Sequence, residues 1–192
     1  MGIPKIDTGP MMVDEFYLFT DRRPDEEKWE LIDGEPILNG SPSPIHQWIL
    51  KNLIISLGLK ERSVGANWTV IPGIGALVSD KSRPEPDAMI LPNDRIRPFH
   101  GGRDTDEAIV LFEIMSPSTA SRDLNWKRAA YASLASLTHY VVIAQDAVDV
   151  VVFARDSGFS EQRYRSLVDE IAFPAIGVSL PLSEIYLNTG LE

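Results

Sequence analysis

The stretch AIVLFEIM, residues 108–115, decides the fold of this chain. It contains no alternation of polar and apolar residues, which is typical of a strand buried on both faces near the centre of a sheet. Its one charged residue is Glu113. Removing an ionised carboxylate from water costs several kcal/mol unless a cation, a metal or hydrogen-bond donors compensate. The sequence therefore predicts that another part of the chain supplies a partner for Glu113.

The composition indicates one globular domain spanning residues 1–192, because 192 residues with 44% hydrophobic content suffice for a single buried core. No run of about 18 apolar residues is present, and Met1 to Pro10 lack the pattern of a signal peptide. We therefore expect no membrane association and a cytoplasmic location.

The residue counts also restrict the kind of metal site. The absence of cysteine excludes disulfides and thiolate zinc sites, and three scattered histidines disfavour an all-histidine site. Any metal would need oxygen ligands. The formal charge of -10 opposes non-specific attraction to polyphosphate, which counts against a nucleic-acid partner.

Periodicity and turn signals predict a mixed α/β (α+β) fold with a sheet flanked by helices. Asp33-Gly34 favours a β-hairpin, and Ser43 followed by Pro44 favours the start of a helix. The expected helices cover residues 12–20, 43–60 and 123–137, and the expected later strands cover 68–71, 76–79, 87–91, 140–144, 148–154 and 163–167. Residues 92–107 are expected to form an exposed loop.

Two further charged residues are predicted to lie near Glu113. Period-two alternation in the strand at 87–91 places Asp87 on the same face as Met89 and Leu91. In the helix that follows Glu113, Lys127 falls in the stripe that contains the apolar residues 124, 131 and 134, so it is predicted to point inward. Two carboxylates and a lysine could hold a hard divalent ion with its water, and Mg²⁺ prefers such oxygen ligands.

At these positions the chain resembles the Uma2 family of restriction-endonuclease-like proteins. The resemblance rests on RPEPD at 83–87, FEIMSPST at 112–119, Asp123, and residues 127–131. It spans about residues 12–186 and includes WELIDG at 29–34, SPIH at 43–46 and LPL at 180–182.

The resemblance implies a restriction-endonuclease-like fold, in which a Pro-Asp step and a downstream Glu-x-Lys form a metal-dependent phosphodiesterase site. Pro86-Asp87 and Glu113 match this PD-(D/E)xK pattern, whereas Met115 stands where the lysine would be. In this family the lysine usually lies on the following helix instead, at the position that Lys127 has in this sequence. The strand at 140–144 also lacks the tryptophan and aspartate found in many relatives.

The roles implied by the family are those of an endonuclease that hydrolyses DNA. Asp87 and Glu113 would bind Mg²⁺, or Mn²⁺ as a substitute, with the carbonyl of Ile114 as a further ligand. Lys127 would orient water or stabilise negative charge, and Glu30 would assist from the hairpin. His46 would approach substrate phosphate. The preference for DNA over RNA comes from the resemblance alone.

Arg83 is a second candidate for substrate binding, because a basic cluster could locally offset the acidic surface. The cluster comprises Lys81, Arg83, Arg95, Arg97 and Arg103. The alternative for these residues is a solvated loop.

Each site residue also has a structural interpretation. Asp87 could accept backbone N–H bonds at the start of a strand, Glu113 could belong to a buried ion pair, and Lys127 could pair with Asp123. His46 could be an ordinary residue of a first helical turn. A non-catalytic interaction or regulatory protein that keeps the nuclease fold is therefore the competing hypothesis, motivated by the acidic charge and by Met115. A homodimer is compatible with either hypothesis.

Overall fold

The computed structural model describes residues 9–96, 102–115 and 120–191, and for residues 95, 96 and 120–123 it describes the backbone alone. The predicted turn at Ser116–Thr119 and Arg97 of the basic cluster lie outside the described residues. The side chains of Arg95 and Asp123 lie outside them as well, so the predicted pairing of Lys127 with Asp123 stays a prediction.

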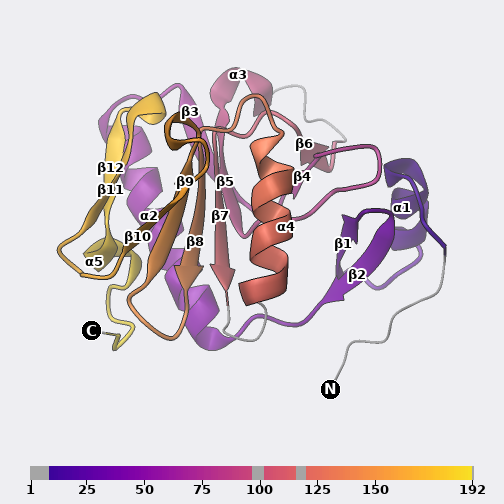
Figure 1. Cartoon of the computed structure of the whole chain (residues 1–192), viewed down its shortest axis with the longest axis horizontal. Helices are drawn as coiled ribbons and strands as arrows, with labels where there is room; N and C mark the ends of the chain where they lie inside the picture. The colour runs from indigo at the N-terminus through magenta and orange to yellow at the C-terminus, as the bar shows by residue number, and fades with distance from the viewer. Residues whose placement is uncertain (1–8, 97–101, 116–119, 192) are drawn as a thin grey trace.

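A six-stranded mixed sheet forms the centre of the fold, with the order β10-β9-β8-β7-β5-β3 (Figure 1). β7 pairs in parallel with β8, and the other pairings are antiparallel. All residues of β7 are buried, which confirms the prediction of a central strand. The strands are β3 (Trp68–Pro72), β5 (Ala88–Pro92), β7 (Val110–Met115), β8 (His139–Ala144), β9 (Val150–Ala154) and β10 (Glu161–Tyr164).

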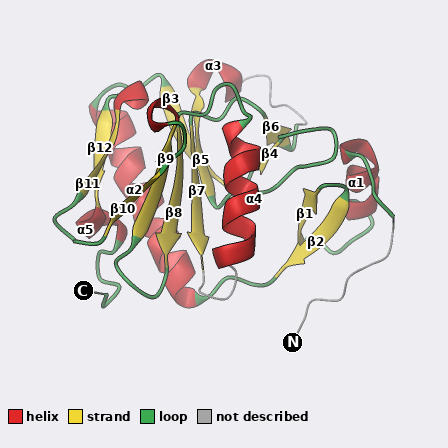
Figure 2. Ribbon diagram, viewed as in Figure 1, coloured by secondary structure: helices red, strands yellow, loops and turns green. Residues whose placement is uncertain are grey.

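Helices cover both faces of this sheet (Figure 2). α2 (Pro44–Ser63) begins where the Ser43 hydroxyl accepts a bond from the His46 N–H at 3.2 Å. Its buried side chains pack with Ala88 and Ile90 of β5. α4 (Ala120–Ala132) covers the opposite face, where Tyr131 packs with alternate residues of β5 and β7. Successive residues of β5 therefore face opposite sides of the sheet, and the residues on each side belong to a different hydrophobic core.

A hairpin lies beside the sheet and has a small core of its own (Figure 1). β1 (Lys28–Ile32) and β2 (Glu35–Asn39) are joined by Asp33 and Gly34, which have φ values of 50° and 83°. Two successive positive φ values define the tight turn that matches the twist of a hairpin, as the sequence predicted. α1 (Val13–Thr20) packs against β1.

The remaining elements are short, and the sequence did not predict most of them. They are β4 (Gly75–Ala76), α3 (Asn93–Ile96), β6 (Asp104–Thr105), β11 (Glu170–Phe173), β12 (Val178–Pro181), α5 (Leu182–Ile185) and the 3-10 helices Arg155–Ser157 and Pro174–Ile176. α3 and β6 lie within the segment expected to be a loop. Among the described residues, no helix has the length and apolarity needed to cross a membrane.

Several predicted boundaries were wrong: α2 ends at Ser63 instead of residue 60, α4 begins at Ala120 instead of residue 123, and β4 ends at Ala76, so the strand predicted at 76–79 is not formed over that range. Two further boundaries differ for local reasons. α4 ends at Ala132 instead of residue 137, because the hydroxyls of Ser133 and Ser136 bond to backbone carbonyls. β10 ends at Tyr164 instead of residue 167, because the next two N–H groups donate to the Asp169 carboxylate and not to a strand.

Candidate active site

Glu113 lies on β7 with its carboxylate toward α4. Lys127 Nζ is 2.8 Å from Glu113 Oε1, and the Tyr131 hydroxyl donates to the same oxygen at 2.9 Å. All three side chains are buried. The prediction that Lys127 points inward is confirmed, and so is the expectation of a compensating partner for Glu113.

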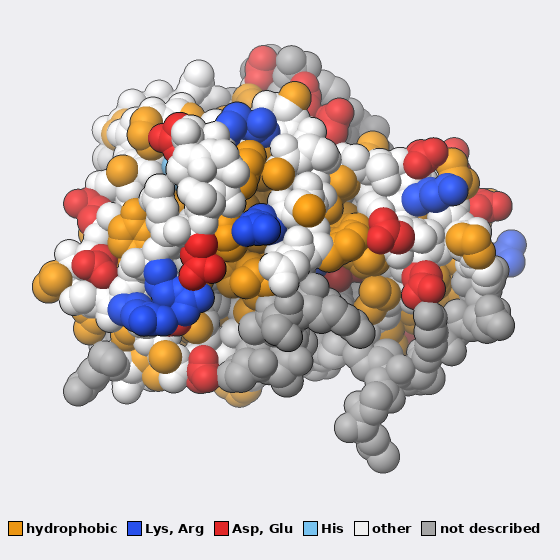
Figure 3. All heavy atoms as spheres, in the orientation of Figure 1, with side chains coloured by type: hydrophobic (Ala, Val, Ile, Leu, Met, Phe, Trp, Pro, Cys, Tyr) orange, Lys and Arg blue, Asp and Glu red, His pale blue; other side chains and the backbone are white. Residues whose placement is uncertain are grey.

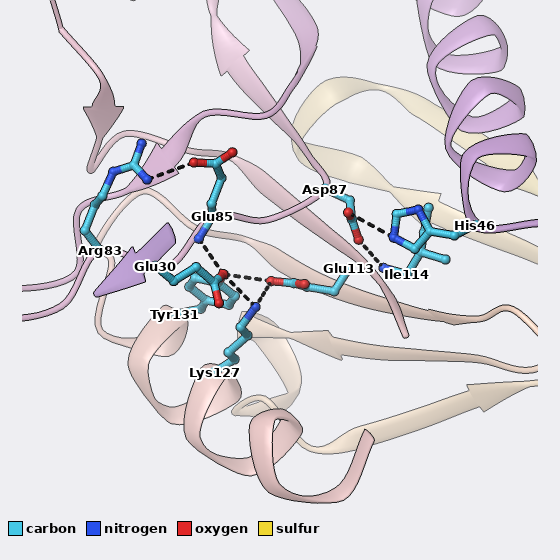
Figure 4. A network of polar contacts seen from close by, with 9 residues as sticks. All are labelled: Glu30, His46, Arg83, Glu85, Asp87, Glu113, Ile114, Lys127 and Tyr131. Carbon is cyan, nitrogen blue, oxygen red and sulfur yellow. Dashed lines mark hydrogen bonds and ion pairs between the residues drawn. The ribbon is translucent and has the colours of Figure 1, made fainter. Parts of the chain in front are cut away.

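Glu30 joins this group from the hairpin (Figure 4). Its Oε1 atom accepts bonds from Lys127 Nζ at 3.1 Å and from the backbone N–H of Glu85 at 2.7 Å. Lys127 is therefore shared between Glu30 on β1 and Glu113 on β7. This contact connects the hairpin with β7 and α4, which follow much later in the sequence.

Asp87 is held through both of its carboxylate oxygens. Oδ2 accepts the backbone N–H of Ile114 at 2.7 Å, and Oδ1 lies 3.1 Å from His46 Nε2. The predicted position on the face of Met89 was wrong, since His46 belongs to the helix on the opposite face. Strand alternation does not extend to Asp87 because β5 begins one residue later.

A cleft of about 710 Å³ brings most of the predicted site residues together. The hairpin, the N-terminal part of α2, the segment that precedes β5 and the end of β7 form its walls. The predicted residues that line it are Glu30, His46, Asp87, Glu113, Ile114 and Lys127. The remaining predicted residue, Arg83, does not line this cleft.

The expectation that Arg83 belongs to an exposed basic cluster was wrong. Its side chain is only 8% exposed, and Nη1 lies 2.8 Å from the carboxylate of Glu85. Nη2 donates to the carbonyl oxygen of Arg103 at 2.6 Å. Gly75 packs so closely that a Cβ atom there would lie 2.1 Å from Arg83 Nε. These contacts give Arg83 a structural role in orienting Glu85, which does line the cleft.

The charges in the cleft alter the protonation of Glu113 and Lys127. Burial raises the pKa of Glu113 to about 8; Lys127 opposes this rise, while Asp87 and Glu30 add to it. Burial by itself lowers the pKa of Lys127, but attraction to Glu113 and Glu30 outweighs burial and raises that pKa. Glu30 and Glu113 contact the ammonium group of Lys127, and Asp87 adds a third carboxyl group to the cleft, so once Glu113 is ionised these groups carry an excess of negative charge that favours a bound cation.

The donor atoms suit a hard cation in kind. Both bonds that the described residues make to Glu113 end on Oε1, so Oε2 has no donor among those residues. Asp87 and Glu113 therefore offer carboxylate oxygens of the type that Mg²⁺ prefers. Within the described ranges, no three His, Asp or Glu side chains form a ready-made metal cluster. Water or substrate would have to complete the ligands.

Sequence reasoning missed the contribution of Tyr131. The residue was placed in the apolar stripe of the helix and in the segment 127–131 that resembles the family, but it was given no role, although it is four residues from Lys127 and so shares its face. A tyrosine in a stripe that already contains a lysine was the available signal, because a buried hydroxyl usually needs a partner.

The fold, a mixed sheet flanked by helices, is shared with a solved structure. It is similar to the crystal structure of "a putative nuclease belonging to DUF820 from Anabaena variabilis ATCC 29413". The TM-score is 0.76 at 15% identity, covering 92% of this chain and 98% of that chain.

The chain belongs to the Uma2 family. The family model, described as "Putative restriction endonuclease", matches residues 13–183. No curated protein matches the sequence.

Proposed function

We propose that this protein is a Mg²⁺-dependent endonuclease that hydrolyses phosphodiester bonds of DNA. The observation that carries the proposal is the meeting of Asp87, Glu113 and Lys127 in one cleft, with one oxygen of Glu113 free of protein donors among the described residues. The family description and the nuclease neighbour support the reaction class. The choice of DNA rests on the description of the family as restriction endonucleases.

Asp87 and Glu113 would hold the cation, and the carbonyl of Ile114 is a third candidate ligand. A bound Mg²⁺ supplies positive charge to the phosphate and lowers the pKa of a coordinated water. The N–H of Ile114 fixes Asp87 from the sheet, which restricts the orientation of this ligand. Both Mg²⁺ and Mn²⁺ suit these oxygen donors.

Lys127 would act on the charge that develops during hydrolysis. Its raised pKa keeps the ammonium group protonated, so it can donate to a water or a phosphate oxygen but cannot accept a proton from water. Glu30 Oε1 accepts a bond from Lys127 Nζ, in addition to the bond that Glu113 accepts. We therefore assign Glu30 to positioning of Lys127.

The net negative charge of the chain is compatible with a substrate that binds only through local contacts in the cleft. Figure 3 shows Lys and Arg side chains interspersed with Asp and Glu on the face that carries α4, without a continuous basic stripe among the coloured residues. The cations among the residues lining the cleft are Lys28 and Lys127. A bound metal would therefore provide much of the attraction for phosphate.

The second candidate is a non-catalytic protein that keeps the fold. One observation favours it: Lys127 contacts both Glu30 and Glu113, so these buried charges compensate one another within the protein. The buried ion pair that this hypothesis required is present, but the same pair is also expected at a catalytic site. Cleavage assays separate the two. A homodimer stays a prediction, which light scattering would test.

The test is cleavage of plasmid DNA, linear DNA and RNA with Mg²⁺ or Mn²⁺, with EDTA as the metal-free reference. We expect metal-dependent cleavage of DNA by the wild type, and a loss of at least about 100-fold in Asp87→Asn and Glu113→Gln. Glu184→Gln is the matched control, because Glu184 also pairs with a lysine, Lys60, but lies outside the cleft. Undiminished cleavage in either site variant would remove that residue from the proposed site.

A further inference from the structure

Tyr131 is locked in place beside Glu113. The residue is fully buried on α4, and its hydroxyl donates to Glu113 Oε1 at 2.9 Å. Its ring meets the edge of Tyr140 at a centroid distance of 5.0 Å, and Tyr140 in turn stacks on Phe153 at 5.8 Å. These ring contacts fix the direction of the hydroxyl, so the hydrogen bond restricts Glu113 more than a bond from a mobile side chain would.

The two donors to Glu113 converge on a single oxygen. Lys127 Nζ and the Tyr131 hydroxyl both bond to Oε1, which leaves Oε2 without a donor among the described residues (Figure 4). Glu113 itself lines the cleft. Rotation of the carboxylate would exchange the two oxygens, but it would break both bonds at once.

We propose that Tyr131 is a positioning residue that holds Glu113 with Oε2 presented to a divalent cation in the cleft. The inference rests on the proposed function, since it assumes that Glu113 is a metal ligand. Tyr131 touches neither substrate nor cation in this role. Hydrogen bonds to metal-ligating carboxylates orient the ligand, and their removal typically weakens metal binding by 10–100-fold.

A tyrosine suits this role better than a second lysine would. Its hydroxyl is a neutral donor that bonds to Glu113 Oε1 without adding charge to the cleft. A second ammonium group would cancel the excess negative charge of the three carboxylates. The hydroxyl instead orients Glu113 and leaves the attraction for a cation intact.

The experiment is Mn²⁺ binding to the whole chain, measured by water proton relaxation for the wild type and for Tyr131→Phe. This variant keeps the ring and removes only the hydroxyl. We expect its Mn²⁺ affinity to be about 10–100-fold weaker. Tyr140→Phe is the matched control, because it removes a buried hydroxyl from the same aromatic stack and leaves the Tyr131 hydroxyl, which donates to Glu113, in place; it should bind Mn²⁺ like the wild type.

The outcomes are distinguishable from those of the proposed function. Equal Mn²⁺ affinity in Tyr131→Phe and the wild type would overturn the role of Tyr131 while the metal site stands. Absence of Mn²⁺ binding by folded wild type, even with DNA present, would overturn both proposals. If Tyr131→Phe does not fold, a crystal structure of the wild type with Mn²⁺ decides: metal on Oε2 with the Tyr131 bond intact supports the inference, and metal on Oε1 overturns it.

Discussion

Lys127 and Glu113 form a buried ion pair between α4 and the central strand β7, with 2.8 Å between Nζ and Oε1. About a tenth of each side chain remains exposed, and that exposure is toward the cleft. Because Glu30 contacts the same ammonium group, the pair also fixes the hairpin to the sheet. One lysine thus links the stability of the domain to the chemistry of the cleft.

Replacement of Lys127 by methionine should destabilise the fold. Glu30 and Glu113 would lose their shared counter-ion, and removal of one partner from a buried pair costs about 3–5 kcal/mol. The measurement is the free energy of unfolding in urea of the variant and the wild type, both at a pH above 8, where Glu113 of the wild type is ionised. The folded variant should still bind Mn²⁺ but cleave more slowly.

Lys60→Met is the control for this substitution. Lys60 pairs with Glu184, but both side chains are partly exposed, so the expected change is below about 1 kcal/mol. Similar losses of unfolding free energy in Lys127→Met and Lys60→Met would show that the buried ion pair stabilises the fold no more than the partly exposed one.

Mn²⁺ affinity should increase with pH up to about 8. Burial raises the pKa of Glu113 to about 8, so below that pH the carboxyl group holds a proton that competes with a metal. One competing proton changes the affinity by at most about tenfold per pH unit. Titrations between about pH 6 and pH 9 test this. An affinity that is constant over this range would contradict the assignment of Glu113 as a ligand.

His46→Ala should weaken Mn²⁺ binding by about tenfold. His46 Nε2 contacts Asp87, and Nδ1 is buried with no hydrogen-bond partner among the described residues, so the geometry favours orientation of Asp87 over contact with phosphate. Its predicted role in substrate binding is still testable by the same variant. A raised KM for DNA with unchanged Mn²⁺ affinity would restore that role.

Gly75→Ala should destabilise the domain by about 2 kcal/mol or more, because the new methyl group would displace the buried guanidinium of Arg83 from its partners. Gly58→Ala, in the middle of α2, meets no atom within 4 Å and should stabilise by up to about 1 kcal/mol. Thermal unfolding of the two variants measures the contrast. Equal behaviour would show that Arg83 can move without cost.

The sequence predicted the centre of the site because two strong sequence patterns, the apolar run of a buried strand and the period of a helix, place charged residues there. The unbroken apolar run identified β7 and gave Glu113 an energetic need for a partner, and the helical period placed Lys127 toward the sheet. Both patterns are local, and burial on both sides of β7 made each of them unambiguous. The hairpin at Asp33-Gly34 was equally local, since its turn requires positive φ values.

The contacts that the sequence did not predict depend on the arrangement of distant segments. Arg83 appeared to be exposed because its neighbours are polar and proline-rich, yet Gly75 leaves room for its guanidinium in the interior. The bond from Tyr131 to Glu113 and the bond from Glu85 to Glu30 need the packed sheet and hairpin. No periodicity specifies which atoms meet across such interfaces.

Mn²⁺ binding to the wild type and to an Asp87→Asn, Glu113→Gln double variant tests the central claim most directly. Both substitutions keep the size of the side chain and remove its charge, and circular dichroism would confirm that the variant is folded. Binding by the wild type that is lost in the double variant is the predicted result. Equal binding by the two proteins, or none by the wild type with DNA present, would contradict a metal site at Asp87 and Glu113.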